Sequence, residues 1–135
     1  MDTETLRLTT GSRLITDLTG DAAAFLTGRG DGLLNVFVPH ATAGLAVIEL
    51  HAGTESDLAD ALDRLLPRQD IYRHRHGSVG HGRDHVLPAF LAPTMTFPVI
   101  GGQVPWGTWQ SLVLVDPNGD NPVRSVRLSF LTTTL

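Results

Sequence analysis

Short runs of apolar and β-branched residues, separated by turn residues, make up most of this 135-residue chain. Their composition and their alternation of apolar with polar side chains are typical of strands. We expect strands at residues 5–10, 12–18, 32–39, 45–50, 94–100, 108–115 and 123–131. Most of these runs are joined by short turns rather than by helices. This favours antiparallel pairing and argues against a Rossmann-type fold.

The turns also predict which strands pair. Gly11 separates the first two runs, which predicts a hairpin of short strands at the N-terminus. The sequence DPNGDNP at residues 116–122 is a strong turn, so we expect strand 123–131 to pair with strand 108–115 as a terminal hairpin. Pro98 confines strand 94–100 to a sheet edge or a bulge. The apolar run at 32–39 predicts a strand buried on both faces near its end.

One amphipathic helix stands out among the strands. Thr54 is a suitable N-cap, leucines 58, 62 and 65 follow at helical spacing, and Pro67 marks the end. Shorter helices are expected at residues 21–26 and 85–91, the second opened by Asp84. The chain is therefore expected to be a single α+β domain over residues 1–135. Its sheet is mixed or antiparallel and β-sandwich-like, with two or three packed helices.

Composition excludes several function classes. The net charge of −4 argues against general binding of nucleic acid. The absence of cysteine excludes a disulfide framework and thiolate chemistry, and the absence of lysine excludes Schiff-base catalysis and a P-loop. No signal peptide and no apolar run long enough to span a bilayer are present, so the expected location is cytoplasmic, without membrane contact.

A histidine-rich segment at residues 71–85 is the main functional candidate. It reads IYRHRHGSVGHGRDH and holds four of the six histidines and three of the ten arginines. It lacks an apolar period of either helix or strand, which is typical of a loop. Neutral imidazole is the commonest metal ligand in proteins. A solvated polar loop is the alternative interpretation, and the segment alone does not decide between them.

Residues outside this segment are further candidates. His40 ends a strand beside a turn of small residues, and Glu49 alternates with Val47 and Leu45, which favours partial burial of its carboxylate. Thr108 and Gln110 alternate on one face of the predicted strand 108–115. Each also has an ordinary structural interpretation, as a turn residue or a residue on the solvent face.

The motifs together resemble the YjbQ family, also called secondary thiamine-phosphate synthases. The matching motifs are His40 in PHATAG, Glu49 in IEL, Tyr72-x-His74, Asp84-His85 and, above all, GQVPWGTWQ at residues 102–110. The resemblance implies a homotrimer of α+β subunits, a metal site at His40, His74 and His85, and weak thiamine-phosphate synthase activity. His51, His76 and His81 match no family histidine and are expected to be solvated. Ala41, Ile48 and Ala52 depart from the usual pattern.

These observations lead to two hypotheses about function. In the first, three imidazoles hold a divalent metal such as Zn²⁺ with one open position for a small-molecule substrate. Glu49 is then a general base or positions a ligand, Thr108 and Gln110 line the pocket, and Arg73, Arg75 or Arg83 binds a phosphate. Three imidazoles match Mg²⁺ poorly, which makes thiamine-phosphate synthesis a side activity. In the second, the protein is a non-catalytic trimeric module that binds a metal or small molecule.

Overall fold

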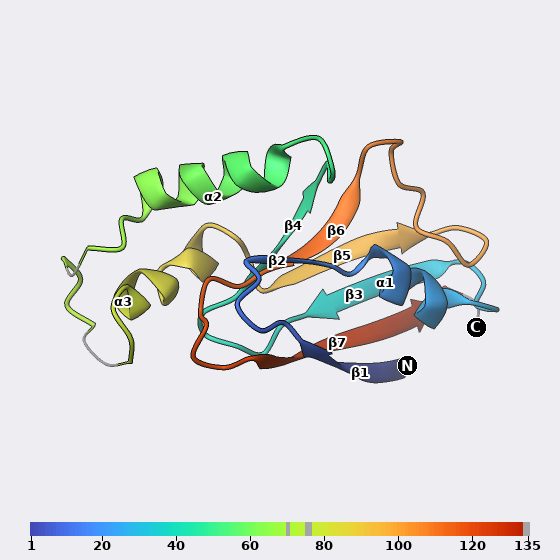
Figure 1. Cartoon of the computed structure of the whole chain (residues 1–135). Coiled ribbons are helices and arrows are strands. Elements are labelled where there is room, and N and C mark those ends of the chain that lie inside the picture. Colours follow the sequence, from blue (N-terminus) through green and yellow to red (C-terminus); the bar gives the residue numbers. More distant parts are fainter. Residues whose placement is uncertain (70, 75–76, 134–135) are drawn as a thin grey trace.

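The computed structural model describes residues 1–69, 71–74 and 77–133 and confirms the α+β prediction. Two antiparallel sheets are accompanied by helices (Figure 1). The elements in chain order are β1 (Asp2–Thr9), β2 (Ile15–Asp17), α1 (Thr19–Leu26), β3 (Gly32–Phe37), β4 (Gly44–Ile48), α2 (Thr54–Leu65), α3 (His81–Asp84), the 3-10 turn η1 (Leu87–Ala89), β5 (Thr94–Val99), β6 (Ser111–Val115) and β7 (Val123–Thr132).

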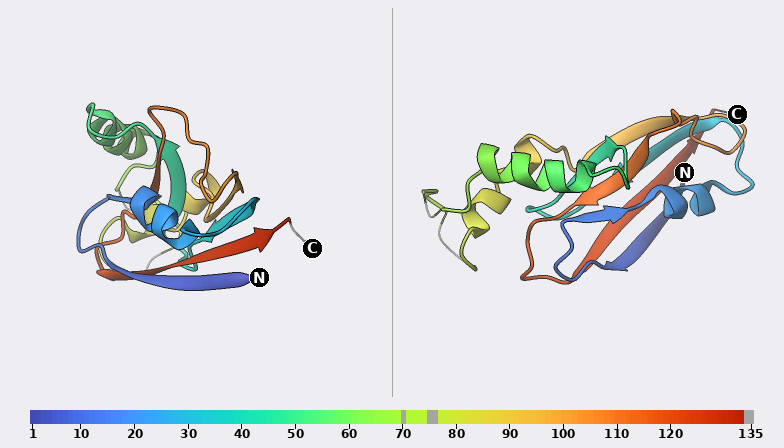
Figure 2. Two further views of the ribbon diagram at one scale, coloured as in Figure 1. Left: turned by 90° about the vertical axis from the view of Figure 1, so that its right-hand side faces the viewer. Right: turned by 45° about the horizontal axis from the view of Figure 1, so that its top comes forward.

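The strands form one sheet in the order β1-β7-β3-β5 and a second in the order β2-β6-β4. Figure 2 shows the two sheets as successive layers, with α2 on the far side of the smaller one. β5 is an edge strand, which confirms the expectation from Pro98. Both predicted hairpins are wrong, because β1 pairs with β7 while β2 pairs with β6. The two connecting turns pass from one sheet to the other, and side-chain alternation does not distinguish such a crossing from a hairpin.

The central strand of the smaller sheet, β6, separates two hydrophobic cores. Leu112 and Leu114 point into the core between the sheets, which α1 helps to close. Val113 and Val115 point to the opposite side and pack with Leu62 of α2. A strand covered on both faces needs apolar side chains at every position, which explains the unbroken run LVLV. β3, in contrast, alternates buried and exposed residues to its end, so its predicted burial on both faces is wrong.

The predicted helix at residues 54–65 is confirmed as α2, but its N-terminus is built differently from the prediction. Gly53 is the N-cap residue, at φ 90°, and no side chain caps the helix there. Instead, the backbone N–H of His51 donates to Oε1 of Glu55 at 2.7 Å. This bond holds the carboxylate over the entry of the helix and lowers the pKa of Glu55.

Two other predicted boundaries shift. β6 begins only at Ser111, because the backbone N–H of Gly107 donates to Oε1 of Gln110 and closes a turn over residues 107–110. The helix expected at 85–91 is replaced by α3, which ends at Asp84, and the separate turn η1. Among the described residues, no helix is long and apolar enough to cross a membrane.

Candidate functional site

Three histidines converge near the loops that follow β3 and β6. His74, His81 and His85 each offer one ring nitrogen, and these nitrogens all lie within 4.8 Å of one another. The Nε2 atoms of His81 and His85 are 2.8 Å apart, and the ring centroids of His74 and His85 are 4.1 Å apart. Such a set of donors is suited to a transition metal ion, in particular zinc.

Local geometry explains why these three rings meet. His81 and His85 are four residues apart, so the helical turn of α3 brings them to the same side. α3 packs directly against the segment that carries His74, since a Cβ at Gly82 would lie 2.8 Å from Cβ of Tyr72 and 2.9 Å from the carbonyl oxygen of His74. Glycine at position 82 therefore permits the close approach.

A buried arginine anchors α3 to α2. The side chain of Arg83 is 3% exposed and donates to Oδ1 of Asp63 at 2.6 Å, to the Leu66 carbonyl and to Oδ1 of Asp84. Burial raises the pKa of Asp84, and the neighbouring Arg83 guanidinium partly offsets this effect. The predicted role of Arg83 in phosphate binding is therefore corrected to an internal ion pair that fixes α3.

Asp120 contacts the cluster from the loop that follows β6. Its Oδ2 lies 3.6 Å from Nδ1 of His81 and accepts hydrogen bonds from the backbone N–H and the hydroxyl of Ser78. These bonds with Ser78 lower the pKa of Asp120. A carboxylate on the second ring nitrogen is the usual way to orient a metal-binding histidine.

His81 and His85 line a pocket of about 430 Å³, and His40 faces the same space. His40 is not a member of the three-histidine set. Its Nε2 accepts the backbone N–H of Ser125 at 2.9 Å. The single proton of a neutral ring must then be on Nδ1. Burial and the nearby Arg124 guanidinium lower the pKa of His40, in agreement with a neutral ring. His40 thus offers an N–H donor, whereas a metal ligand requires a free lone pair.

A buried polar network forms the wall of this pocket. Arg124, 4% exposed, is held by both carboxylate oxygens of Asp116 and donates to the hydroxyl of Thr42 at 3.0 Å. The amide of Asn118 contacts the same hydroxyl. Buried charges of this kind need pairing and hydrogen bonds, which each partner here supplies.

The remaining predicted site residues lie elsewhere. Glu49 is exposed just beyond the end of β4, so its predicted burial is wrong. Thr108 and Gln110 are exposed in the turn before β6, not on a strand. None of the three lines the histidine pocket. Arg73 is exposed. Arg75 and His76 lie outside the described residues.

Sequence reasoning missed His81, Asp120 and Arg124. His81 was expected to be solvated, but it is 7% exposed and completes the set with His74 and His85. The spacing of four between His81 and His85 was the signal that could have identified it. His51 is exposed, as expected. Residues 116–122 were interpreted only as a turn, although their concentration of aspartate and asparagine beside a strand end is also suited to a site.

Comparisons with known proteins agree with this architecture. The family model described as UPF0047 protein YjbQ-like matches residues 4–133. UPF0047 protein Rv2556c of Mycobacterium tuberculosis is 64% identical over 131 residues, covering 97% of this chain and 98% of its own length. The crystal structure of the hypothetical protein APE1520 from Aeropyrum pernix K1 superposes with a TM-score of 0.87 at 30% identity, covering 97% of this chain and 98% of the other. The YbjQ-like protein of unknown function SSO2532 from Sulfolobus solfataricus P2 has the same fold, with a TM-score of 0.86 at 22% identity, covering 96% and 95%.

Proposed function

The chain belongs to the UPF0047 (YjbQ-like) family, and within it we propose that this protein is a metal-dependent enzyme acting on a small anionic molecule. The convergence of His74, His81 and His85 carries this proposal, because two of the three, His81 and His85, also line a pocket. Three imidazoles leave room for a further ligand, as catalytic zinc sites do and closed structural sites do not.

The donor set fits zinc or a similar ion better than magnesium. Imidazole suits Zn²⁺, whereas Mg²⁺ prefers carboxylate oxygens and water. His74, His81 and His85 would hold the ion, and Asp120 would orient the ring of His81 through Nδ1. When bound, zinc supplies Lewis acidity and lowers the pKa of bound water to about 7.

Other residues that line the pocket support an anionic substrate. Nδ1 of His40 lies 3.4 Å from Nη1 of Arg124, and with the ring proton on Nδ1 both atoms are donors. An anionic oxygen that accepts from both relieves this contact between two donors. Asp116 holds the guanidinium of Arg124 in place, so little reorganisation is needed when a ligand binds. His40 therefore positions an oxygen of the substrate by hydrogen bonding. A phosphate or carboxylate group matches these donors. Hydrolysis or a lyase step on such a molecule is the reaction class we propose.

Zinc occupancy and turnover test the proposal together. We expect the purified protein to bind about one zinc ion per chain, and we expect His81→Ala to weaken zinc binding by more than about 100-fold. His51→Ala is the matched control, because His51 is exposed and lies outside the cluster. Hydrolysis of phosphate esters should follow zinc occupancy. Unchanged zinc affinity in His81→Ala would contradict the metal centre.

Thiamine-phosphate synthesis enters only as a side activity in this proposal. Displacement of pyrophosphate usually relies on Mg²⁺ held by carboxylates, which a three-imidazole site does not provide. We expect slow synthase turnover that added Mg²⁺ does not raise to the level of the zinc-dependent reaction. Fast, Mg²⁺-dependent synthesis would refute this ranking of the two activities.

A non-catalytic binding module is the second candidate. It is favoured by the depth at which His81 and its neighbours are buried, since a structural metal also needs a shielded site. His40→Ala separates the two candidates, because His40 is not in the cluster but faces the pocket. Loss of turnover with zinc retained supports the enzyme. Zinc binding with no turnover in either protein supports the module.

We further propose that the protein is a homotrimer, as the family resemblance implies. Leu33 and Leu131 pair across β3 and β7 on the outer face of the larger sheet and are 41% and 53% exposed. Phe37 is also exposed on this face. The rest of this face is polar, with Asn35 paired to Thr96 and Ser129, so the apolar row at Leu33 is the part that we propose as the subunit contact.

A further inference from the structure

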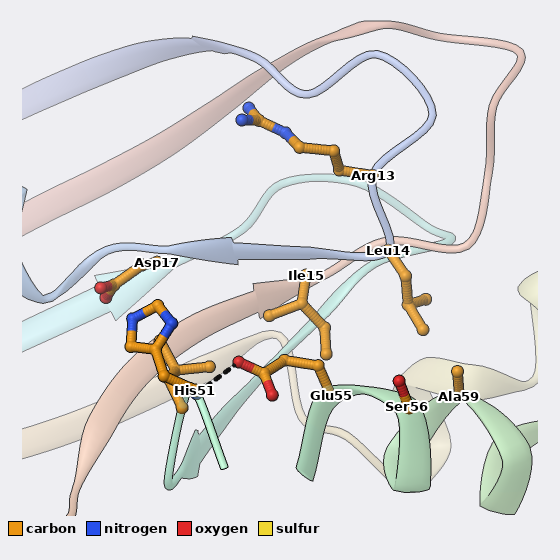
Figure 3. Close-up of a pocket in the computed structure, with 9 residues that line it drawn as sticks. Arg13, Leu14, Ile15, Asp17, His51, Glu55, Ser56 and Ala59 are labelled. Carbon is orange, nitrogen blue, oxygen red and sulfur yellow. Dashed lines mark hydrogen bonds between the residues drawn. The ribbon is translucent and has the colours of Figure 1, made fainter. Parts of the chain in front are cut away.

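A second pocket lies between β2 and the first turns of α2 (Figure 3). Its volume is about 420 Å³, within the range of about 300–1,000 Å³ of small-molecule sites. It shares no lining residue with the histidine pocket. The lining residues are Arg13, Leu14, Ile15, Asp17, Leu50, His51, Glu55, Ser56 and Ala59.

The floor of this pocket is apolar. Leu14, Ile15 and Leu50 are partly buried and pack against the core beneath α2. Because that core supports them from below, their upper surfaces form a stable apolar platform. The pocket thus offers burial for a short aliphatic or aromatic body.

Polar groups gather at one end. In Figure 3, Asp17, His51 and Glu55 lie at one end of the pocket, and Leu14, Ser56 and Ala59 lie at the other. Oδ1 of Asp17 accepts the backbone N–H of Thr19 at 2.9 Å, and Oε1 of Glu55 accepts that of His51 at 2.7 Å. The carboxylate of Glu55 also accepts its own backbone N–H. Backbone N–H groups therefore orient both carboxylates at this end of the pocket.

The basic residue in the lining does not neutralise this end. Arg13 is directed away from α2 in Figure 3, and its Nη2 donates to the Thr9 carbonyl at 2.8 Å. His51 adopts a left-handed backbone conformation, φ 68°, which is uncommon for a residue with a side chain. That conformation aims its N–H at Glu55 and places its ring in the lining. The polar end consequently carries two carboxylates and one imidazole.

We propose that this pocket binds a small organic cation, an ammonium group with a short aliphatic or aromatic body. The ammonium is attracted by the negative charges of Asp17 and Glu55, and the body lies over Leu14 and Ile15. Both carboxylates are already oriented by backbone N–H groups, so little conformational freedom is lost on binding. A carboxylate or phosphate of the same size is repelled by the same pair of charges.

Benzylammonium is a suitable probe, with benzoate and benzyl alcohol as partners of the same shape. Titrations followed by the methyl NMR signals of Leu14, Ile15 and Leu50 locate binding at this pocket. We expect benzylammonium to bind at least about tenfold more tightly than benzyl alcohol, and we expect benzoate to leave these signals unchanged. Equal binding of benzoate and benzylammonium overturns the proposal.

Substitutions distinguish binding of benzylammonium in the pocket from attraction to negative charge anywhere on the surface. Asp17→Asn and Glu55→Gln keep the oxygen that accepts the backbone N–H, and each should weaken benzylammonium binding about threefold to fivefold, as expected for exposed charge pairs. Asp60→Asn removes a carboxylate of α2 outside the pocket and should change nothing. Ala59→Leu fills the apolar end and should weaken binding at least tenfold. Equal effects of Asp60→Asn and Glu55→Gln, or no effect of Ala59→Leu, overturn the proposal.

Discussion

The protonation state of His40 determines what this side chain can do in the pocket. The fixed N–H of Ser125 occupies Nε2, so the ring is neutral with its proton on Nδ1. A charged ring would direct a second N–H at the Ser125 N–H, which no rotation of the ring relieves without breaking the bond. The role of His40 as a donor therefore follows from one backbone contact.

This state makes a prediction about the pH dependence of stability. Burial and Arg124 lower the pKa of His40 in the folded protein. The unfolded chain therefore takes up the proton first, near pH 6.5. The stability that the neutral His40 ring contributes to the folded protein is therefore fully present above that pH. It is lost as the pH falls from there through the lower pKa of His40 in the folded protein. Between pH 7.5 and 5.0, urea unfolding of the metal-free wild type should lose more free energy than His40→Gln, with His51→Gln as control. An equal loss in wild type and His40→Gln would contradict the assigned state.

The buried ion pairs of Arg83 lead to a second prediction for a single residue. Arg83→Met leaves Asp84, whose side chain is 4% exposed, without its buried counter-ion. Removing one partner of a buried pair costs about 3–5 kcal/mol of unfolding free energy. The matched control is Arg68→Met, because Arg68 is half exposed and lies 4.0 Å from Asp63. The control should cost less than about 1 kcal/mol in denaturant titrations. A similar loss in both variants would show that Arg83 does not anchor α3.

Sequence reasoning identified only part of the candidate site. His74 and His85 were predicted as ligands from a resemblance, and the structure does bring them together. His81 was not predicted as a ligand, because the sequence around a histidine in a glycine-rich segment does not indicate that its side chain is buried. Nothing in the sequence distinguishes Arg83 and Arg124 from exposed arginines. Their burial becomes clear only in the fold, where Asp63 pairs with Arg83 and Asp116 pairs with Arg124.

At the scale of elements, the two turns that cross between the sheets explain why pairing was mispredicted. The N–H groups of Thr10 and Gly11 both donate to the Pro122 carbonyl, so the two crossings lie side by side. Alternating side chains identified β1 and β7 as strands, and an unbroken apolar run identified β6. They did not predict their partners, because a crossing turn uses the same glycine, proline and asparagine residues as a hairpin.

The approach of β4 to the segment before β5 depends on a glycine. A Cβ at Gly44 would lie 1.9 Å from the Leu91 carbonyl oxygen, and the neighbouring Leu45 N–H donates to the Ala92 carbonyl at 2.9 Å. Gly44→Ala must displace backbone, so we expect a loss of about 3 kcal/mol or more in unfolding free energy. Gly30→Ala, where a Cβ meets nothing within 4 Å, is the control and should change stability by less than about 1 kcal/mol. A tolerated Gly44→Ala would contradict the close approach.

At the scale of the whole molecule, the two faces of the larger sheet differ. The inner face packs on the smaller sheet and α1. The outer face has an apolar row across three strands, in which Leu33 pairs with Pro98 on one side and Leu131 on the other. The sequence predicts this alternation, but it does not indicate whether the outer face meets water or another chain. This is the point at which the proposed trimer can be tested.

Disruption of that row should dissociate the proposed trimer. Leu33→Glu places a carboxylate in the middle of the row, where burial against another subunit would cost several kcal/mol. Native mass should fall from about three times the chain mass of 14.5 kDa to that of one chain, while the fold is retained. Leu65→Glu, at an exposed leucine of α2, is the matched control and should keep the wild-type mass. A wild-type protein that already has the mass of one chain contradicts the trimer. A Leu33→Glu variant that keeps the larger mass places the subunit contact on another face.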